Sequence, residues 1–277
     1  MRRGLISRQY HPDGLDMGLV YRYAPSAFAE QAHHQVSPQY RFISTKRVLQ
    51  ALLQVGFQVV GASQSSVKDI GREPFTKHQL RLRLPPNPNW TVGDVFPELL
   101  LMNAHDRSGA FELLLAFWRY WCGNGCAAKI ADIGSSIRIR HAGEVSGVVD
   151  AALYIASQSH RLNTILTEWQ SILLTANQQH QFADQAASIR WKGGAPIPSE
   201  DLLTVQRPQD AGDDLFHVYQ RVEENLIQGG LPGLSRTVNP KTGARRKLVT
   251  RSVQSVLTDT KINTQLWTLA ESFAQAA

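Results

Sequence analysis

The amino-acid sequence predicts an α+β fold: a mostly antiparallel N-terminal sheet with a short helix, followed by a long helix and a C-terminal helical part. Segments of alternating apolar and polar residues lie before residue 142, and apolar residues at helical spacing follow Gly143. Because the strands precede the helices instead of alternating with them, an α/β fold is disfavoured. We expect a β-rich part with an irregular N-terminal arm over residues 1–142 and a helical part over residues 143–277, together forming one compact unit.

The N-terminal arm is expected to give way to a strand, a helix and a second strand. The first 38 residues have weak periodicity and several prolines and glycines, which leaves room for one short helix at residues 25–31. Residues 40–44 are rich in strand formers, and Thr45 suits the N-cap of a helix over residues 46–55 that ends at Gly56. Residues 57–62 predict the second strand.

The clearest strand covers residues 77–84, where the leucines fall on one face and Gln79, Arg81 and Arg83 on the other. Residues 98–103 predict a buried strand that ends in a turn. We favour a returning strand for residues 111–121 because of that tight turn, although the spacing also fits a helix. Residues 136–141 alternate again.

The C-terminal half predicts four helical segments. One long helix, or two helices in line, should cover residues 144–175, and a second segment follows at residues 177–188. Residues 213–228 and 261–274 carry the remaining apolar periodicity. Between these last two segments, residues 229–258 are expected to form a loop, because this stretch holds several prolines and glycines.

That loop is basic. No Asp or Glu occurs from Asn225 to Thr258. The stretch contributes a charge of +6, whereas the rest of residues 143–277 sums to −7 and residues 1–142 sum to +7. Its cations are Arg236, Lys241, Arg245, Arg246, Lys247 and Arg251. A purely cationic segment indicates a polyanionic partner, most commonly nucleic acid. The alternative is that the charge serves solubility and self-complementarity between subunits.

Composition limits the class of protein. The chain has 277 residues, of which 43% are hydrophobic and 19% charged, as is usual for a soluble globular protein. The sequence contains no run of about 18 apolar residues, so a membrane helix is not expected. The first eight residues lack the apolar core of a secretory signal. Two cysteines cannot form a disulfide framework for a chain of this size. We expect a cytoplasmic protein with no membrane partner.

Arginines on the predicted strands are further candidates for nucleic-acid contact. If the strands lie in one sheet, Arg81, Arg83, Arg138 and Arg140 would form a cationic strip along a phosphate backbone. The alternative is a solvated polar face with scattered ion pairs. Arg119 lies among Trp118, Tyr120 and Trp121, which could stack on bases. A buried hydrophobic strand explains the same aromatics.

Signatures of catalysis or metal binding are weak. Cys122 and Cys126 flank a Gly-Asn-Gly turn, and no second cysteine pair completes a zinc site. His105 and Asp106 could belong to a nuclease, but a hairpin turn needs the same residue types. The glycine-rich segments lack the spacing of a phosphate loop or a dinucleotide fingerprint. The sequence therefore predicts no catalytic residues, no metal and no cofactor, and an enzyme is the less favoured class.

Several motifs resemble those of a known family. The matching segments are residues 40–45, 56–58, 77–83, 97–106 with Asn103-Ala104-His105-Asp106 at their end, 117–120 leading into 122–125, 220–231, 261–263 and 266–267. Together they resemble the prophage- and plasmid-borne family of unknown function typified by the enterobacterial YfjQ and YafZ proteins. The resemblance implies residence on a mobile genetic element and assigns no reaction. Strands followed by a long helix are also similar to phage single-strand annealing proteins, by fold-level analogy.

These observations lead to one expected function. The sequence predicts a DNA-binding protein of a mobile element that binds or anneals single-stranded DNA during phage or plasmid recombination, with a homo-oligomer as a further candidate assembly. The expected contact residues are Arg81, Arg83, Arg119, Arg138, Arg140, Arg236, Lys241, Arg245, Arg246, Lys247 and Arg251. The alternative is an inhibitor of a host defence system that acts by protein–protein contact through the acidic helical part.

Overall fold

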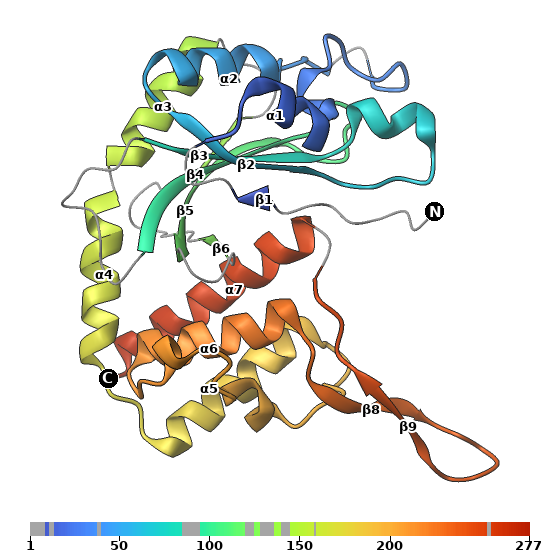
Figure 1. The fold of residues 1–277 in the computed structure, drawn as a ribbon, viewed down its shortest axis with the longest axis vertical. Coiled ribbons are helices and arrows are strands. Elements are labelled where there is room, and N and C mark those ends of the chain that lie inside the picture. The colour runs from blue at the N-terminus through green and yellow to red at the C-terminus, as the bar shows by residue number, and fades with distance from the viewer. Residues whose placement is uncertain are drawn as a thin grey trace. The chain divides into compact units, whose positions relative to one another are not determined.

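The chain forms two units, residues 1–163 and residues 164–277. The computed structural model describes residues 9–10, 14–37, 40–84, 95–119, 125–127, 136–139, 145–157, 159–253 and 256–277. The first unit is built on an antiparallel sheet and the second on helices, so the predicted α+β class is confirmed (Figure 1). None of the described helices combines the length and apolar character that a membrane crossing requires.

The sheet of the first unit has the strand order β1-β2-β3-β4-β5-β6, and β7 also pairs with β5. Every pairing is antiparallel. The strands are β1 (Gln9–Tyr10), β2 (Gln58–Gln64), β3 (His78–Arg83), β4 (Val95–Asn103), β5 (Phe111–Arg119), β6 (Gly125–Ala127) and β7 (Ser136–Ile139). The strand assignment for residues 111–121 is thus confirmed over Phe111–Arg119.

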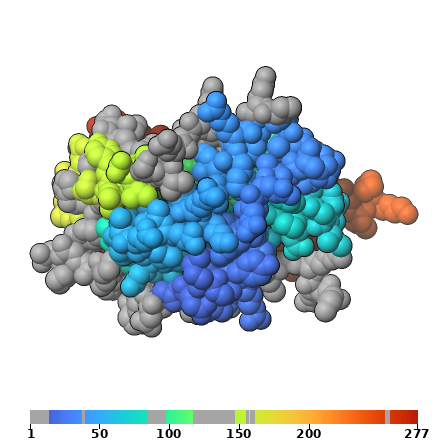
Figure 2. Space-filling model, turned by 90° about the horizontal axis from the view of Figure 1, so that it is seen from above, coloured from blue at the N-terminus to red at the C-terminus, as the bar shows by residue number. Residues whose placement is uncertain are grey.

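Three helices cover one face of this sheet (Figure 1). They are α1 (Met17–Tyr23), α2 (Thr45–Gln54) and α3 (Val145–Ser157). Helix α2 begins one residue earlier than predicted, because the N-cap is Ser44 and not Thr45: the Ser44 side chain accepts a hydrogen bond from the backbone N–H of Arg47. Figure 2 views this unit from above and shows the N-terminal segments side by side on its outer surface.

Two expectations for the N-terminal region are wrong. The arm contains α1, whose N-terminus is capped by the side chain of Asp16, in addition to a short 3-10 helix at Pro25–Phe28. Residues 40–44 form no strand. Instead, the Tyr40 hydroxyl donates to the Ala104 carbonyl and the Phe42 ring packs on His105. These side chains fasten the segment to the turn after β4, which local β propensity cannot indicate.

The core of the first unit lies between the sheet and its helices. Leu80 and Leu82 of β3 are fully buried, as are Val48, Leu49 and Leu52 of α2. Burial of each such side chain contributes about 1.5–3 kcal/mol. A short 3-10 helix, Ile70–Phe75, links β2 to β3.

The second unit packs its helices around α6. The helices are α4 (Ser159–Ser171), which begins before the unit boundary, α5 (Ala176–Arg190), α6 (Leu215–Gln228) and α7 (Val256–Gln275), with 3-10 turns at Ser199–Leu203 and Pro208–Asp210. The rings of Trp169, Tyr219 and Trp267 join α4, α6 and α7, with the two tryptophan centroids 4.5 Å apart. Eleven residues of α6 are buried, so this helix is the centre of the unit.

The segment expected as a loop at residues 229–258 contains a β-hairpin, and its last residues begin α7. Strand β8 (Pro232–Val238) pairs antiparallel with β9 (Arg245–Val249), and the two project from the helices of the second unit (Figure 1). The turn is closed by a hydrogen bond from Asn239 N to the Ala244 carbonyl, and the side chain of Asn239 accepts from Lys241 N. The prolines and glycines that suggested a loop lie at the start of β8 and in this turn, where strands tolerate them.

Candidate functional site

The hairpin is attached to the helical unit through an ordered root. Gly230 N donates to the Thr250 carbonyl at 2.8 Å, and Thr250 N donates to the Leu231 carbonyl at 2.9 Å. Leu231 N also donates to the Thr250 hydroxyl at 3.0 Å. Gly229 has a φ of +67°, and a Cβ there would lie 2.7 Å from the Thr250 carbonyl oxygen. Only glycine therefore fits at this position of the root.

Arg190 of α5 joins the two ends of this root. Its guanidinium donates to the carbonyls of Leu226, near the end of α6, and of Arg251, just after β9. The same guanidinium lies 4.8 Å from the centroid of the Trp191 ring. Val253 N adds a hydrogen bond to the Ile227 carbonyl at 2.8 Å. The hairpin β8–β9, called the basic arm from here on, therefore leaves the helical unit in a fixed direction.

All six cations of the basic stretch are exposed, as are the three apolar side chains Leu234, Val238 and Val249. The cations are Arg236, Lys241, Arg245, Arg246, Lys247 and Arg251. No ion pair connects them to a carboxylate within the described part of the chain. The sequence of this stretch contains no acidic residue, so the hairpin itself carries only positive side-chain charge.

Arg81 and Arg83 do not belong to this exposed set. Arg81 Nε lies 2.8 Å from one carboxylate oxygen of Glu98, and Arg83 pairs with the other oxygen. The Glu98 side chain is fully buried and that of Arg81 is 9% exposed. The expectation that β3 presents an open cationic face is therefore wrong. Glu98 lies on the neighbouring strand β4, and both guanidiniums are engaged with its carboxylate inside the unit, where a phosphate backbone does not reach them.

Other predicted contact residues lie outside the described side chains. The backbone of Arg138 lies opposite Glu112 in the β5–β7 ladder, and that of Arg119 lies opposite Val95. Their side chains, the side chains of Trp118 and Cys126, residues 120–124 and the whole of Arg140 are outside the described part, so the structure does not test the aromatic and cysteine features predicted there. Among the described side chains of the predicted set, the six cations of the hairpin segment are the exposed ones, and Arg81 and Arg83 meet at the buried Glu98.

A buried polar network that sequence reasoning missed lies where α2, β3 and β4 meet. His78 Nδ1 lies 3.1 Å from the Thr76 carbonyl, which can only accept, so this nitrogen carries a proton. Burial lowers the pKa of His78 to about 4, so the ring is neutral and Nε2 accepts a hydrogen bond from the Thr45 hydroxyl. Asn103 Nδ2 in turn donates to Thr45 Oγ1 at 3.0 Å. Ser26 Oγ lies 3.0 Å from His78 Nδ1.

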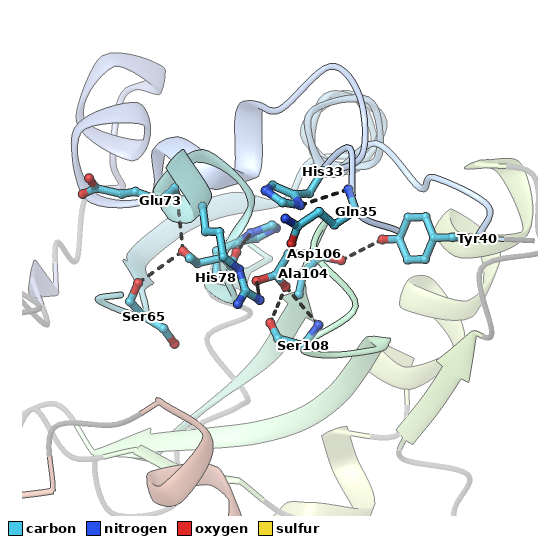
Figure 3. Close-up of polar contacts among 11 residues, drawn as sticks. His33, Gln35, Tyr40, Ser65, Glu73, His78, Ala104, Asp106 and Ser108 are labelled. Atoms are coloured by element: carbon cyan, nitrogen blue, oxygen red, sulfur yellow. Dashed lines mark hydrogen bonds and ion pairs between the residues drawn. The ribbon is translucent and has the colours of Figure 1, made fainter. Parts of the chain in front are cut away.

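Asp106 stands at the edge of this network (Figure 3). Asp106 accepts hydrogen bonds from Ser108 N at 2.9 Å and from Arg72 Nη2 at 2.9 Å. Burial opposes its charge, but these hydrogen bonds and the charge of Arg72 prevail and lower the pKa of Asp106. Burial, with a smaller contribution from Asp106, raises the pKa of Tyr40 to about 12.

The geometry supports the turn interpretation of residues 103–109. Arg107 has a φ of +67°, which the Asp106–Ser108 hydrogen bonds stabilise. His105 is fully buried, and its Nε2 lies 3.5 Å from Thr45 Oγ1. In the described ranges, no group of three or more His, Cys, Asp or Glu residues is placed to hold a metal ion. The network fixes protons inside the first unit and connects its elements.

Comparison with known proteins identifies the family. Residues 32–267 match the family described as "Domain of unknown function (DUF932)". The chain belongs to this family. Two relatives from Escherichia coli (strain K12), UPF0380 protein YafZ and UPF0380 protein YfjQ, are each 34% identical over 257 residues, covering 91% of this chain and 89% of the relative. The resemblance seen in the motifs is thereby confirmed. No solved structure matches this chain significantly.

The range matched to DUF932 contains both features described above. The hairpin strands β8 and β9 and the His78 network apart from Ser26 lie inside residues 32–267, whereas α1 precedes them. Signals for the network were present in the sequence. Asn103, His105 and Thr45 all stand in the segments that carry the family resemblance, but only the fold shows that they meet at His78.

Proposed function

We propose that this DUF932 protein binds DNA through the β8–β9 hairpin, as a component of a mobile genetic element. The observation that carries the proposal is the exposure of six cations on an arm that contains no acidic residue. A positive surface of this kind attracts the phosphate backbone and releases its counterions. The ordered root supports the proposal, because a fixed arm loses less entropy on binding than a free tail.

The DNA that we propose is single-stranded, and the activity is binding or annealing. Annealing breaks no covalent bond and needs only alignment of two strands on a cationic surface. Arg81 and Arg83 are buried against Glu98, so the proposed binding surface is the hairpin and does not include β3. A homo-oligomer would place several arms along one strand and increase the avidity of binding.

The charge of the arm sets the expected salt dependence. A single strand loses affinity with a slope of about −0.7 per phosphate contact on a log–log plot, so six contacts give a slope of about −4. Affinity should then fall a few hundredfold between about 50 and 200 mM salt. Contacts from fewer of the cations would give a proportionally smaller slope.

Fluorescence anisotropy with a labelled 30-nucleotide single strand tests the proposal. The double variant Arg245→Ala with Arg246→Ala should weaken binding to every sequence. It should also make the salt slope shallower by the contribution of about two phosphate contacts. The matched control removes two exposed cations outside the hairpin, Arg47→Ala with Lys261→Ala, and should leave affinity nearly unchanged. No binding of any nucleic acid at about 50 mM salt would refute the proposed function.

A second candidate is an inhibitor of a host defence system that acts by protein contact. The acidic balance of the helical part outside the basic stretch favours it. Part of that acidity is used internally, because Asp210 pairs with Arg207 at 2.7 Å and Asp214 caps α6 and contacts His217 at 2.6 Å. Binding to a purified defence protein that survives nuclease treatment and the Arg245→Ala/Arg246→Ala change would support this candidate over the first.

A further inference from the structure

The two faces of the hairpin differ in what they meet. Residues directly opposite in an antiparallel pair project to the same face. Pro232 lies opposite Val249 and Leu234 opposite Lys247, so these four form one face, named here the outer face. Gly233 lies opposite Leu248 on the other face.

The other face is covered by the helical unit itself. Leu234 N donates to the Pro196 carbonyl at 2.8 Å, which brings residues 196–197 alongside β8. A Cβ at Gly233 would collide with the Pro196 carbonyl oxygen and lie 2.8 Å from the Ile197 side chain, so this face is packed closely. Leu248 is half-buried. The outer face must therefore point away from the unit.

The outer face exposes apolar side chains among cations. Leu234 is 47% exposed and Val249 is 60% exposed, beside the exposed Pro232 and Lys247. Phosphate contacts explain Lys247 but give no reason for two large apolar side chains on a projecting arm, where water contact is unfavourable. A ligand that fits this face has to supply both negative charge and apolar surface.

We propose that the outer face is the surface on which the bases of single-stranded nucleic acid lie, while their phosphates meet the cations of the hairpin segment. Unpaired bases present flat apolar surfaces beside a charged backbone, whereas a duplex stacks those surfaces away from a flat binding face. The inference rests on the proposed function and adds the surface that contacts bases. The absence of acidic residues from Asn225 to Thr258 favours this occupant over a cationic or neutral protein surface.

Three probes of equal length separate base contacts from phosphate contacts. They are a labelled 30-nucleotide oligothymidylate, the same backbone with abasic sites at every position, and a 30-base-pair duplex. The wild-type protein should bind the oligothymidylate about tenfold or more tightly than the abasic strand, which keeps the phosphates and lacks the bases. Equal affinity for these two strands would overturn the inference while leaving electrostatic DNA binding intact.

The variant Leu234→Ser with Val249→Ser isolates the outer face. It should bind the oligothymidylate as weakly as the wild type binds the abasic strand, with an unchanged salt slope, because no cation is removed. The matched control, Leu173→Ser with Val205→Ser, changes two exposed apolar residues elsewhere in the same unit and should retain the preference for bases. An unchanged preference in the outer-face variant, or a duplex bound more tightly than the oligothymidylate, would refute the inference. Loss of all binding in the wild type would refute the proposed function instead.

Discussion

The hydroxyl of Thr45 donates a hydrogen bond to Nε2 of His78 at 2.8 Å in the interior of the first unit. Thr45 is the first residue of α2, and His78 is the first residue of β3. The bond therefore joins the start of the main covering helix to the sheet. It requires a neutral imidazole with its proton on Nδ1, as the contact with the Thr76 carbonyl specifies.

Protonation of His78 should destabilise the protein in mild acid. Burial lowers the folded-state pKa of His78 to about 4, below the value of about 6.5 expected when unfolded. The unfolded chain therefore takes up a proton first, and stability falls as the pH decreases from about 6.5 to about 4, by up to about 3 kcal/mol. Urea denaturation at several pH values measures this loss. His78→Gln cannot titrate and should show a shallower decline over this window; parallel curves would contradict the prediction.

Removal of the Thr45 hydroxyl should cost stability without a change of volume. Thr45→Val leaves His78 Nε2 and one Asn103 N–H donor without their partner in a fully buried site. A buried polar group without a partner costs about 1–3 kcal/mol, so the free energy of unfolding should fall by that amount. Thr45→Ser keeps the hydroxyl and serves as the control. If both variants lost the same stability, the methyl group and not the hydrogen bond would be responsible.

Neutralising Glu98 should destabilise the sheet and leave DNA affinity unaltered. Glu98→Gln leaves the charges of Arg81 and Arg83 without their buried carboxylate, a change that typically costs about 3–5 kcal/mol. Thermal unfolding measures the loss, and Glu73→Gln, at an exposed glutamate of the same unit, is the control. Binding of the folded fraction to the single strand should match the wild type. A gain in affinity would mean that the freed arginines contact DNA after all.

Replacement of Gly229 should loosen the hairpin without removing any cation. Gly229→Ala places a Cβ 2.7 Å from the Thr250 carbonyl oxygen at a φ of +67°. The root should distort, trypsin should cut the basic arm faster, and DNA affinity should fall. Gly243→Ala is the control: its φ of +69° is also positive, but its Cβ meets no atom within 4 Å. Equal trypsin rates for the two variants would show that the root does not hold the arm.

Local sequence patterns predicted the regular elements well. Alternation found β3, and helical spacing found α5 and α6, because in these segments the buried face repeats with the period of the element. The hairpin was missed because its strands are exposed on both sides near the tip and show no alternation of apolar and polar residues. The positive charge of this stretch was still predicted correctly, because the charge of a segment can be counted from its residues without knowledge of the fold.

Local sequence patterns could not show which side chains pair with one another inside the fold. Arg81 and Arg83 alternate with leucines as residues on a wet face do, yet both sides of β3 are buried. Glu98 lies 15 to 17 residues away in the sequence and meets the two arginines only after β3 and β4 pair. The network at His78 has the same origin, because its members span sequence separations of up to 60 residues.

Arg190 joins the two ends of the hairpin root through main-chain carbonyls, those of Leu226 in α6 and of Arg251 after β9, and not through side chains. Every amino acid offers such a carbonyl, so substitutions of exposed residues on β8, β9 and their turn leave these two hydrogen bonds intact, whereas Gly233 is fixed by its close packing on Pro196 and Ile197. The side chains of the arm can consequently diverge between relatives while its direction is inherited. Evolution could thereby alter what the arm binds by changing residues on β8 and β9, with no compensating change in α5 or α6.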